Sequence, residues 1–243
     1  MNCKEKLLEV RDLHKVYTKE GVPTKALNGI TFNVLNGEYL GIMGASGSGK
    51  TTLCNLIARF WDVESGSVLV GGQNVKDYTL EGLMDQISMV FQKVYLFADT
   101  VENNIKFGCP NATHEEVVAA AKKACCHDFI LTLPQGYDTV IGEGGSSLSG
   151  GEKQRISIAR AILKDAPIVI LDEATANVDP ENEDRLQKAI EALTRDKTIL
   201  MIAHRLKTVR NADQILVLGR QTSESTQYGR QDFTVEPYED LDL

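Results

Sequence analysis

The sequence of 243 residues lacks any long apolar run, because stretches such as 168–171 and 199–203 end after a few residues. A helix that crosses a bilayer needs about 20 predominantly apolar residues, so we expect no membrane span. The first ten residues are polar and charged, and we expect no secretory signal peptide. Basic residues are not in excess either: the net charge is −8, which disfavours nonspecific binding to nucleic acids.

Cysteine pairs at metal-binding spacing are also missing. The five cysteines are odd in number and none forms a C-x-x-C pair, so reduced thiols in a cytosolic protein are the favoured interpretation. Negative charge gathers in residues 221–243, which hold six acidic residues and one arginine. This tail has little apolar periodicity, and we expect it to be disordered; docking of the tail elsewhere as a short ligand-like segment is the alternative.

A glycine-rich stretch, IMGASGSGKTT at residues 42–52, matches the phosphate-binding pattern G-x-x-x-x-G-K-[ST]. It follows a short apolar run at 39–43 and opens into a helical pattern at 52–60, which is the context that the pattern requires. Glycines let backbone N–H groups turn toward an anion, and the helix adds the positive end of its dipole. The nucleotide contacts predicted here are Gly44, Ser46, Gly47, Ser48, Gly49, Lys50, Thr51 and Thr52.

The roles of two of these residues follow from their chemistry. Lys50 supplies a positive charge for the β- and γ-phosphates of ATP, and the Thr51 hydroxyl is a ligand for Mg²⁺. The alternative, a Gly/Ser-rich turn that happens to precede a lysine, does not explain the agreement of spacing and context.

The pattern of the chain predicts an α/β fold. Residues 7–17 and 26–35 are typical of antiparallel strands, whereas the apolar runs at 168–171 and 199–203 are typical of buried parallel strands. Between residues 93 and 164 the strand signals stop, and helices are predicted at 115–126, 128–133 and 150–163. Thr113 is the expected N-cap of the first, with Glu116 completing a capping box. We therefore predict a helical insertion in a mostly parallel α/β core that carries an N-terminal antiparallel subdomain.

Two carboxylates end the buried strand at 168–171. Asp172 and Glu173 must lie at its carboxyl end, where ligands bind in open α/β sheets. Asp172 is a predicted Mg²⁺ ligand, acting through water beside Thr51, and Glu173 is placed to orient or deprotonate the water that attacks the γ-phosphate. The alternative is a pair of capping carboxylates in a turn.

A second anion site is predicted at the motif LSGGEKQ, residues 148–154. Ser149, Gly150, Gly151 and Glu152 open a predicted helix, where a hydroxyl and backbone N–H groups face outward. The alternative is an ordinary Ser-Gly helix start. Since one chain carries two phosphate-binding elements about 100 residues apart in sequence, we expect two copies to pair head to tail, each nucleotide lying between the loop of one copy and the LSGGE turn of the other.

Three further residues are weaker candidates when taken singly. Gln92 follows a core strand and is predicted to contact Mg²⁺ or the attacking water. His204 follows the strand at 199–203 and is placed to hydrogen-bond the γ-phosphate. Tyr17 could stack on a purine ring, although an ordinary strand tyrosine is the simpler interpretation without the phosphate loop.

The phosphate loop, Gln92, LSGGEKQ, ILDE at 170–173 and His204, in this order, resemble the nucleotide-binding domain of ATP-binding cassette (ABC) transporters over residues 7–220. The resemblance implies a P-loop NTPase fold, with 1–92 and 165–220 forming the β-subdomain and RecA-like core and 93–164 the helical subdomain. It also implies ATP hydrolysis with Mg²⁺, a head-to-tail homo- or heterodimer, and transmembrane domains as partners at the cytoplasmic face of the membrane. Tyr17 is implied as the adenine-stacking aromatic, Glu173 as the catalytic base and His204 as the switch histidine.

Segments near Gln92 and LSGG resemble the exporter subtype, in which they meet the coupling helices of the transmembrane part: 95–97, 100–105 and 142–144. Residues 1–58 resemble the subtype that serves lipoprotein release and macrolide efflux, whereas 59–219 resemble multidrug exporters. We therefore hypothesise a chimera of two such domains, with its junction in the helix after the loop. The acidic tail replaces the usual C-terminal extension, and Asn177 stands where exporters often have serine.

Two other classes of function compete with an export ATPase. Soluble members of the family, active in translation or DNA repair, usually carry two cassettes or long coiled-coil insertions, and this sequence has neither. A nucleotide-binding scaffold with weak turnover is the other alternative, including one produced by a chimera. The presence of both Glu173 and His204 argues against a degenerate site.

Overall fold

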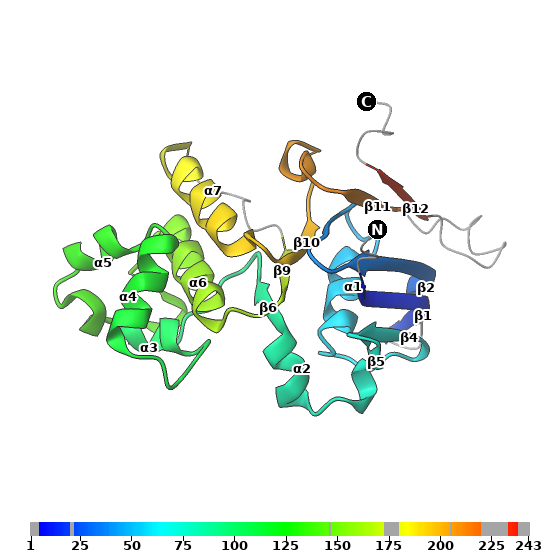
Figure 1. Cartoon of the computed structure of the whole chain (residues 1–243), viewed down its shortest axis with the longest axis horizontal. Coiled ribbons are helices and arrows are strands. Elements are labelled where there is room, and N and C mark those ends of the chain that lie inside the picture. The colour runs from blue at the N-terminus through cyan, green and yellow to red at the C-terminus, as the bar shows by residue number, and fades with distance from the viewer. Residues whose placement is uncertain are drawn as a thin grey trace. The chain divides into compact units, whose positions relative to one another are not determined.

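The chain divides into two compact units, Met1–Ile87 with Thr198–Leu243 and Ser88–Lys197. In the computed structural model, the residues described are 5–19, 22–145, 147–172, 180–204, 206–219 and 233–237 (Figure 1). Across these described ranges, no helix combines the length and the apolar character needed to cross a bilayer.

An antiparallel sheet forms one layer of the first unit. Its strands are β1 (Lys6–Lys19), β2 (Val22–Leu35), β4 (Ser65–Val70) and β5 (Gln73–Asn74), in the order β2-β1-β4-β5. Alternate side chains such as Leu8 and Val10 are buried, as period-2 patterning requires. The predicted antiparallel strands are therefore confirmed, and both are longer than expected.

Parallel strands form the second layer of this unit. The strand β3 (Tyr39–Gly44) pairs in parallel with β10 (Thr198–Ile202) and β11 (Gln214–Leu218). All five residues of β10 are buried. The helix α1 (Lys50–Ile57) follows β3, and the remaining short elements are η1 (Val75–Asp77), α2 (Leu80–Gln86) and η4 (Leu206–Val209). The predicted α/β fold class is confirmed by this combination of an antiparallel sheet and parallel strands.

A strand also occurs in the acidic tail. Residues Phe233–Pro237 form β12, which pairs antiparallel with β11 from Gln214↔Pro237 to Leu218↔Phe233. The sequence predicted no regular structure here, so the structure differs from that expectation for these five residues. Phe233, Thr234 and Val235 have high β-propensity, and the exposed edge of β11 supplies the backbone partners that a short isolated segment lacks.

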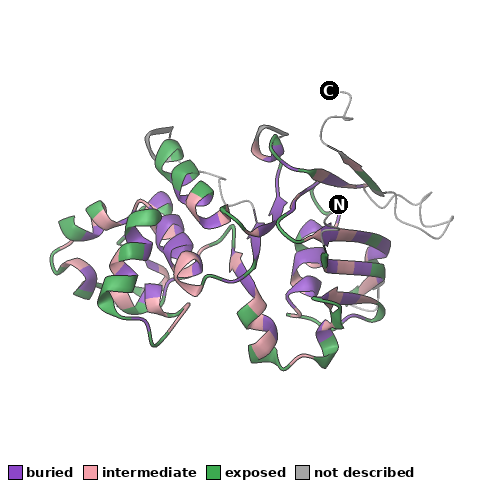
Figure 2. Cartoon of the chain, viewed as in Figure 1, coloured by how far each residue is buried: buried purple, intermediate pink, exposed green. Residues whose placement is uncertain are grey.

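Helices dominate the second unit. They are α3 (Val101–Lys106), α4 (His114–Lys123), α5 (His127–Thr132), α6 (Gly150–Lys164) and α7 (Pro180–Thr194), with the 3-10 turns η2 (Gly136–Asp138) and η3 (Glu143–Gly145). Strands β6 (Ile87–Val90) and β9 (Ile168–Asp172) are neighbours, and β7 (Asp99–Thr100) pairs with β8 (Val140–Ile141). The helix α6 lies between α4 and α7, and most of its residues are buried (Figures 1 and 2).

The two ends of α4 have recognisable caps. At its start, the Thr113 hydroxyl accepts a hydrogen bond from Glu116 N, and the Glu116 carboxylate accepts one from Thr113 N at 2.7 Å. The predicted capping box is therefore confirmed. The helix ends at Lys123, three residues earlier than predicted, because Cys125 adopts a φ of 54°. Cys125 N donates to Lys122 O and Cys126 N to Ala121 O, which is a Schellman motif.

We predict that Thr113→Ala lowers the free energy of unfolding by about 1 kcal/mol, because the hydroxyl that accepts from Glu116 N is lost. Thr113→Ser is the matched control, since it keeps the oxygen at the same position of the cap. Urea denaturation followed by circular dichroism measures the difference. Equal stability of the alanine and serine variants would contradict a stabilising cap.

Candidate phosphate-binding site

The loop between β3 and α1 carries the predicted phosphate contacts. Ser46, Gly47 and Thr51 are exposed, whereas Ser48 and Lys50 are buried and Gly49 and Thr52 are partly exposed. Gly44, Gly47 and Gly49 have φ angles of 146°, 80° and 95°, which side-chain-bearing residues rarely adopt. These three conformations turn the chain from the end of the strand directly into the first turn of α1.

Two of the glycines also occupy positions without room for a side chain. A Cβ atom at Gly44 would lie 2.4 Å from Leu218 O, and one at Gly49 would lie 2.4 Å from Ala26 O. Both distances are far below van der Waals contact, so neighbouring backbone from β11 and β2 encloses the loop. The glycines are thus required by packing as well as by φ.

The Lys50 side chain folds into this loop. Its Nζ donates to Gly44 O at 2.8 Å and to Ala45 O at 3.0 Å, and the residue is only 6% exposed. A buried ammonium is stable when its donors have partners, and here the loop carbonyls provide them. The positive charge is therefore held at the glycine loop, where a phosphate group would be attracted to it.

Tyr17 and His204 belong to the same unit as the loop. Tyr17 lies on β1 and the residue is 37% exposed, with Lys15 Nζ 5.5 Å from the centroid of its ring. His204 is exposed just beyond β10, which runs parallel to β3 with Ile202 opposite Ile42. Because carboxyl ends of adjacent parallel strands lie at one edge of a sheet, His204 and the loop after Gly44 share that edge.

The turn at Ser149 starts α6 in the second unit. Ser149 Oγ accepts from Glu152 N at 3.3 Å, and Ser149 N donates to Glu152 Oε2 at 2.8 Å, which forms a capping box. Ser149 and Gly150 are exposed, Gly151 is buried, and nothing lies within 4 Å of a Cβ built at Gly150. The Ser149 hydroxyl oxygen accepts from Glu152 N, so the O–H group can donate a hydrogen bond to an anion outside the helix.

The remaining predicted residues of the second unit follow strands. Gln92 is exposed after β6, and Asp172 is the last residue of β9 and is buried. Glu173 and Asn177 lie outside the described residues. The structure thus gathers Tyr17, the loop and His204 in one unit, and Gln92, Asp172 and the Ser149 turn in the other.

No cluster of three or more His, Cys, Asp or Glu side chains suitable for a metal is found among the residues that the structure describes. Mg²⁺ does not need such a cluster, because it keeps several waters and takes its other ligands from one or two protein groups and from substrate phosphates. The exposed hydroxyl of Thr51, in the first turn of α1, is a donor of that kind.

Sequence reasoning missed a buried cation of α6, Arg155. Arg155 is 2% exposed, and its Cζ lies 5.2 Å from the centroid of the Phe129 ring on α5. Burial lowers the pKa of Arg155, although an arginine in a protein stays charged. The signal in the sequence was an arginine within the apolar pattern of residues 155–163, which identifies a buried charge but not its partner.

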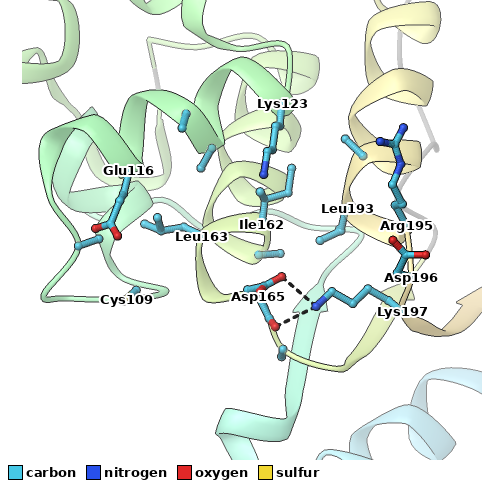
Figure 3. A pocket seen from close by; sticks show the side chains of 16 residues that line it. Cys109, Glu116, Lys123, Ile162, Leu163, Asp165, Leu193, Arg195, Asp196 and Lys197 are labelled. Carbon is cyan, nitrogen blue, oxygen red and sulfur yellow. Dashed lines mark hydrogen bonds and ion pairs between the residues drawn. The ribbon is translucent and has the colours of Figure 1, made fainter. Parts of the chain in front are cut away.

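A cavity of about 660 Å³ lies elsewhere, among α4, the C-terminal half of α6 and the end of α7 (Figure 3). Lys197 Nζ contacts Asp165 Oδ1 at 2.8 Å beside it, and Lys123 and Arg195 are also in its lining. None of the predicted site residues lines this cavity. Its lining also balances three basic with three acidic side chains, so it lacks the excess positive charge that a triphosphate requires.

Comparison with known proteins finds a family model and relatives that match this chain. A family model described as "ABC transporter" matches residues 27–176. The chain is 51% identical over 211 residues to an ATP-dependent lipid A-core flippase of Syntrophus aciditrophicus, covering 87% of this chain and 34% of the flippase. It is 53% identical over 192 residues to a protein of Staphylococcus aureus described as a multidrug export ATP-binding/permease protein, and this match covers 79% of this chain and 33% of that protein.

A solved structure supports the same assignment. A bacterial Atm1-family ABC exporter with ATP bound matches 99% of this chain and 40% of its own, at 37% identity and a TM-score of 0.84. The chain spans about a third of the length of the curated relatives that it matches.

We predict that Gly49→Ala weakens ATP binding by about tenfold or more, because its Cβ would meet Ala26 O and displace the loop, and ~1.4 kcal/mol corresponds to a factor of ten. Gly37→Ala is the matched control: Gly37 has a φ of 74° but nothing within 4 Å of its Cβ. It therefore reports backbone strain alone, of about 1–3 kcal/mol. Calorimetric titration with ATP measures both variants, and equal affinities would show that enclosure of the loop does not matter.

Proposed function

The chain belongs to the ABC transporter family, as an ATP-binding and ATP-hydrolysing domain of the exporter type, and from this premise we propose that its ATP hydrolysis drives export through attached or associated transmembrane domains. The observation that carries the proposal is the glycine loop between β3 and α1, in which the Lys50 ammonium is held by Gly44 O and Ala45 O. The class of compound that is exported is determined by the transmembrane domains.

Two copies of the domain form the working unit in this proposal. Each copy has one anion-binding element at the start of α1, around Lys50, and another at the start of α6, around Ser149. Head-to-tail pairing puts the triphosphate between the loop of one copy and the exposed Ser149 and Gly150 of the other. The O–H group of the capped Ser149 donates a hydrogen bond to a γ-phosphate oxygen, and the α6 dipole stabilises the negative charge of that phosphate.

Hydrolysis rests on residues at the strand ends. Glu173 takes a proton from the attacking water. The water oxygen bonds to the γ-phosphorus while the bond between that phosphorus and the bridging oxygen of ADP breaks. His204 and Gln92 orient the γ-phosphate and this water, and Tyr17 stacks on adenine. Thr51, Asp172 and Gln92 would hold Mg²⁺, and the ion would supply positive charge that offsets the negative charge of the phosphates.

An exposed group of aromatic side chains supports the proposed membrane partner. Tyr95, Phe97 and Phe107 are 53%, 38% and 62% exposed, and together they are named the aromatic surface. Clustered exposed apolar side chains mark interaction sites. We assign this surface of the helical subdomain to docking of the transmembrane domains, at the cytoplasmic face of the membrane. The chimera hypothesis and the division into subdomains at 93–164 remain predictions.

Glu173→Gln is expected to keep ATP binding and to lower the rate of phosphate release by about a hundredfold or more, because the amide cannot accept the proton of the attacking water. Glu191→Gln is the matched control, since it removes an exposed carboxylate of α7. Phosphate release and the ratio of bound ATP to ADP are measured together. Hydrolysis by Glu173→Gln at the parent rate would refute the assignment of the base.

Glu152→Gln tests the charge at the Ser149 turn. A glutamine oxygen still accepts from Ser149 N, so the capping box and the stability are expected to remain. Loss of the negative charge near the proposed triphosphate is expected to lower KM for ATP about threefold, or ~0.6 kcal/mol for one screened charge. The effect should shrink in high salt.

Glu115→Gln, in the first turn of α4, is the control for this substitution because it also removes an acid from a helix start. Steady-state ATPase measurements at two salt concentrations give the comparison. An unchanged KM in Glu152→Gln would show that Glu152 does not face the nucleotide, and a raised KM would contradict the expected repulsion between Glu152 and the triphosphate.

A further inference from the structure

The aromatic surface is packed as one group. The rings of Tyr95 and Phe97 meet edge to face with centroids 5.4 Å apart, and those of Phe97 and Phe107 are 4.6 Å apart. Tyr95 and Phe97 precede α3, and Phe107 follows it directly. Residues on both sides of α3 therefore contribute to a single exposed surface, and something must hold the two sides together.

Arg160, on α6, lies against this group. Its Cζ is 5.8 Å from the centroid of the Phe97 ring and 5.4 Å from that of Phe107, within the range of cation–π attraction. Its Nε donates to Asn104 O at 2.8 Å, and one terminal nitrogen lies 3.4 Å from Asn104 Oδ1. A single side chain of α6 thus contacts both rings and the helix between them.

Asn104 continues the connection. It is 1% exposed, its Oδ1 accepts from Phe97 N at 2.8 Å, and its Nδ2 donates to Phe97 O and to Thr100 O, each at 3.0 Å. This amide pairs with the Phe97 backbone as a neighbouring strand would. The contacts form a series from Arg160 through Asn104 to Phe97.

The chain after α3 is fixed to the same residue of α6. A Cβ atom at Gly108 would lie 2.4 Å from Arg160 O and 3.2 Å from Arg160 Cγ, so only glycine permits this approach. The loops on both sides of α3 are therefore attached to α6 at Arg160. Ser149 lies eleven residues earlier, which corresponds to about 16 Å along a helix, so Arg160 cannot reach the anion-binding turn itself.

We propose that Arg160 is a positioning residue that fixes the aromatic surface to α6, so that this surface and the Ser149 turn move as one rigid body. The consequence of this attachment rests on the proposed function. When nucleotide binding displaces the Ser149 turn, the aromatic surface moves by the same amount and displaces the membrane partner docked on it. Neither nucleotide nor partner touches Arg160, and its role is mechanical.

Hydrogen exchange tests the attachment in the 243-residue chain without nucleotide. In Arg160→Met, the amides of residues 96–100 are expected to exchange about tenfold faster, because the hydrogen bond from Phe97 N loses its support and local opening follows. Arg160→Lys keeps the charge but lacks the planar donor group, and should restore less than half of the protection. Lys122→Met, which removes an exposed cation of α4, is the control.

The amides of residues 117–121 in α4 serve as an internal reference for global unfolding. Faster exchange at 96–100 with no change at 117–121 supports the proposal. Unchanged exchange at 96–100 in Arg160→Met, or full protection in Arg160→Lys, overturns it.

Rigid-body motion is tested by a distance between two spin labels, at the exposed Ala98 beside the aromatic surface and at the exposed Ser147 before the Ser149 turn. The cysteines other than the buried Cys54 and Cys126 are first replaced by serine. Labelled Glu173→Gln is mixed with an excess of unlabelled Glu173→Gln, so that a dimer formed on Mg·ATP carries only one labelled copy. A single narrow distance is then expected that is the same with and without Mg·ATP. Arg160→Met should broaden it at least twofold.

A distance that shifts with Mg·ATP, or one that Arg160→Met leaves narrow, overturns the proposal. Failure of the proposed function has a different signature. The chain would then bind no ATP in calorimetry, while the distance without nucleotide would still report on Arg160.

Discussion

A buried positive charge inside a glycine-rich loop is the constraint on which the site depends. The Lys50 ammonium needs acceptors, and the carbonyls of Gly44 and Ala45 provide them only because the loop turns through positive φ angles. Backbone from β2 and β11 leaves no space for a Cβ at Gly49 or Gly44. Sheet packing, loop conformation and charge are therefore set together, and the result is a cationic loop at the start of a helix.

The helix α6 plays the corresponding part in the second unit. Its first turn is capped so that the Ser149 hydroxyl and the Gly150 backbone face outward. Farther along, Arg155 lies against Phe129, and Arg160 holds Asn104 and the aromatic surface. One continuous hydrogen-bonded helix thus connects the Ser149 turn with the aromatic surface. A helix transmits displacement over this length because its backbone bonds resist bending more than loops do.

Local patterns could be predicted from the sequence, and long-range pairings could not. The glycine loop, the capping box at Thr113 and the buried strand predicted at 168–171 depend on residues close in sequence. The strand β12 was missed because its partner β11 is about fifteen residues earlier and its own segment is acidic. Asn104 and Arg160 were missed because a buried amide or a half-buried guanidinium is explained only by the groups it meets in the fold. Glu173 lies outside the described residues, so its role as the base remains a prediction.

The central claim is that the Lys50 loop of one copy and the Ser149 turn of another enclose the same triphosphate. Light scattering of Glu173→Gln during size-exclusion chromatography, with and without Mg·ATP, tests it most directly when Ser149→Arg is combined with it. The account predicts that Mg·ATP doubles the mass of Glu173→Gln, and that the added Ser149→Arg keeps the chain monomeric although it still binds ATP. A monomer at saturating Mg·ATP without Ser149→Arg, or a dimer that persists with it, would contradict the account.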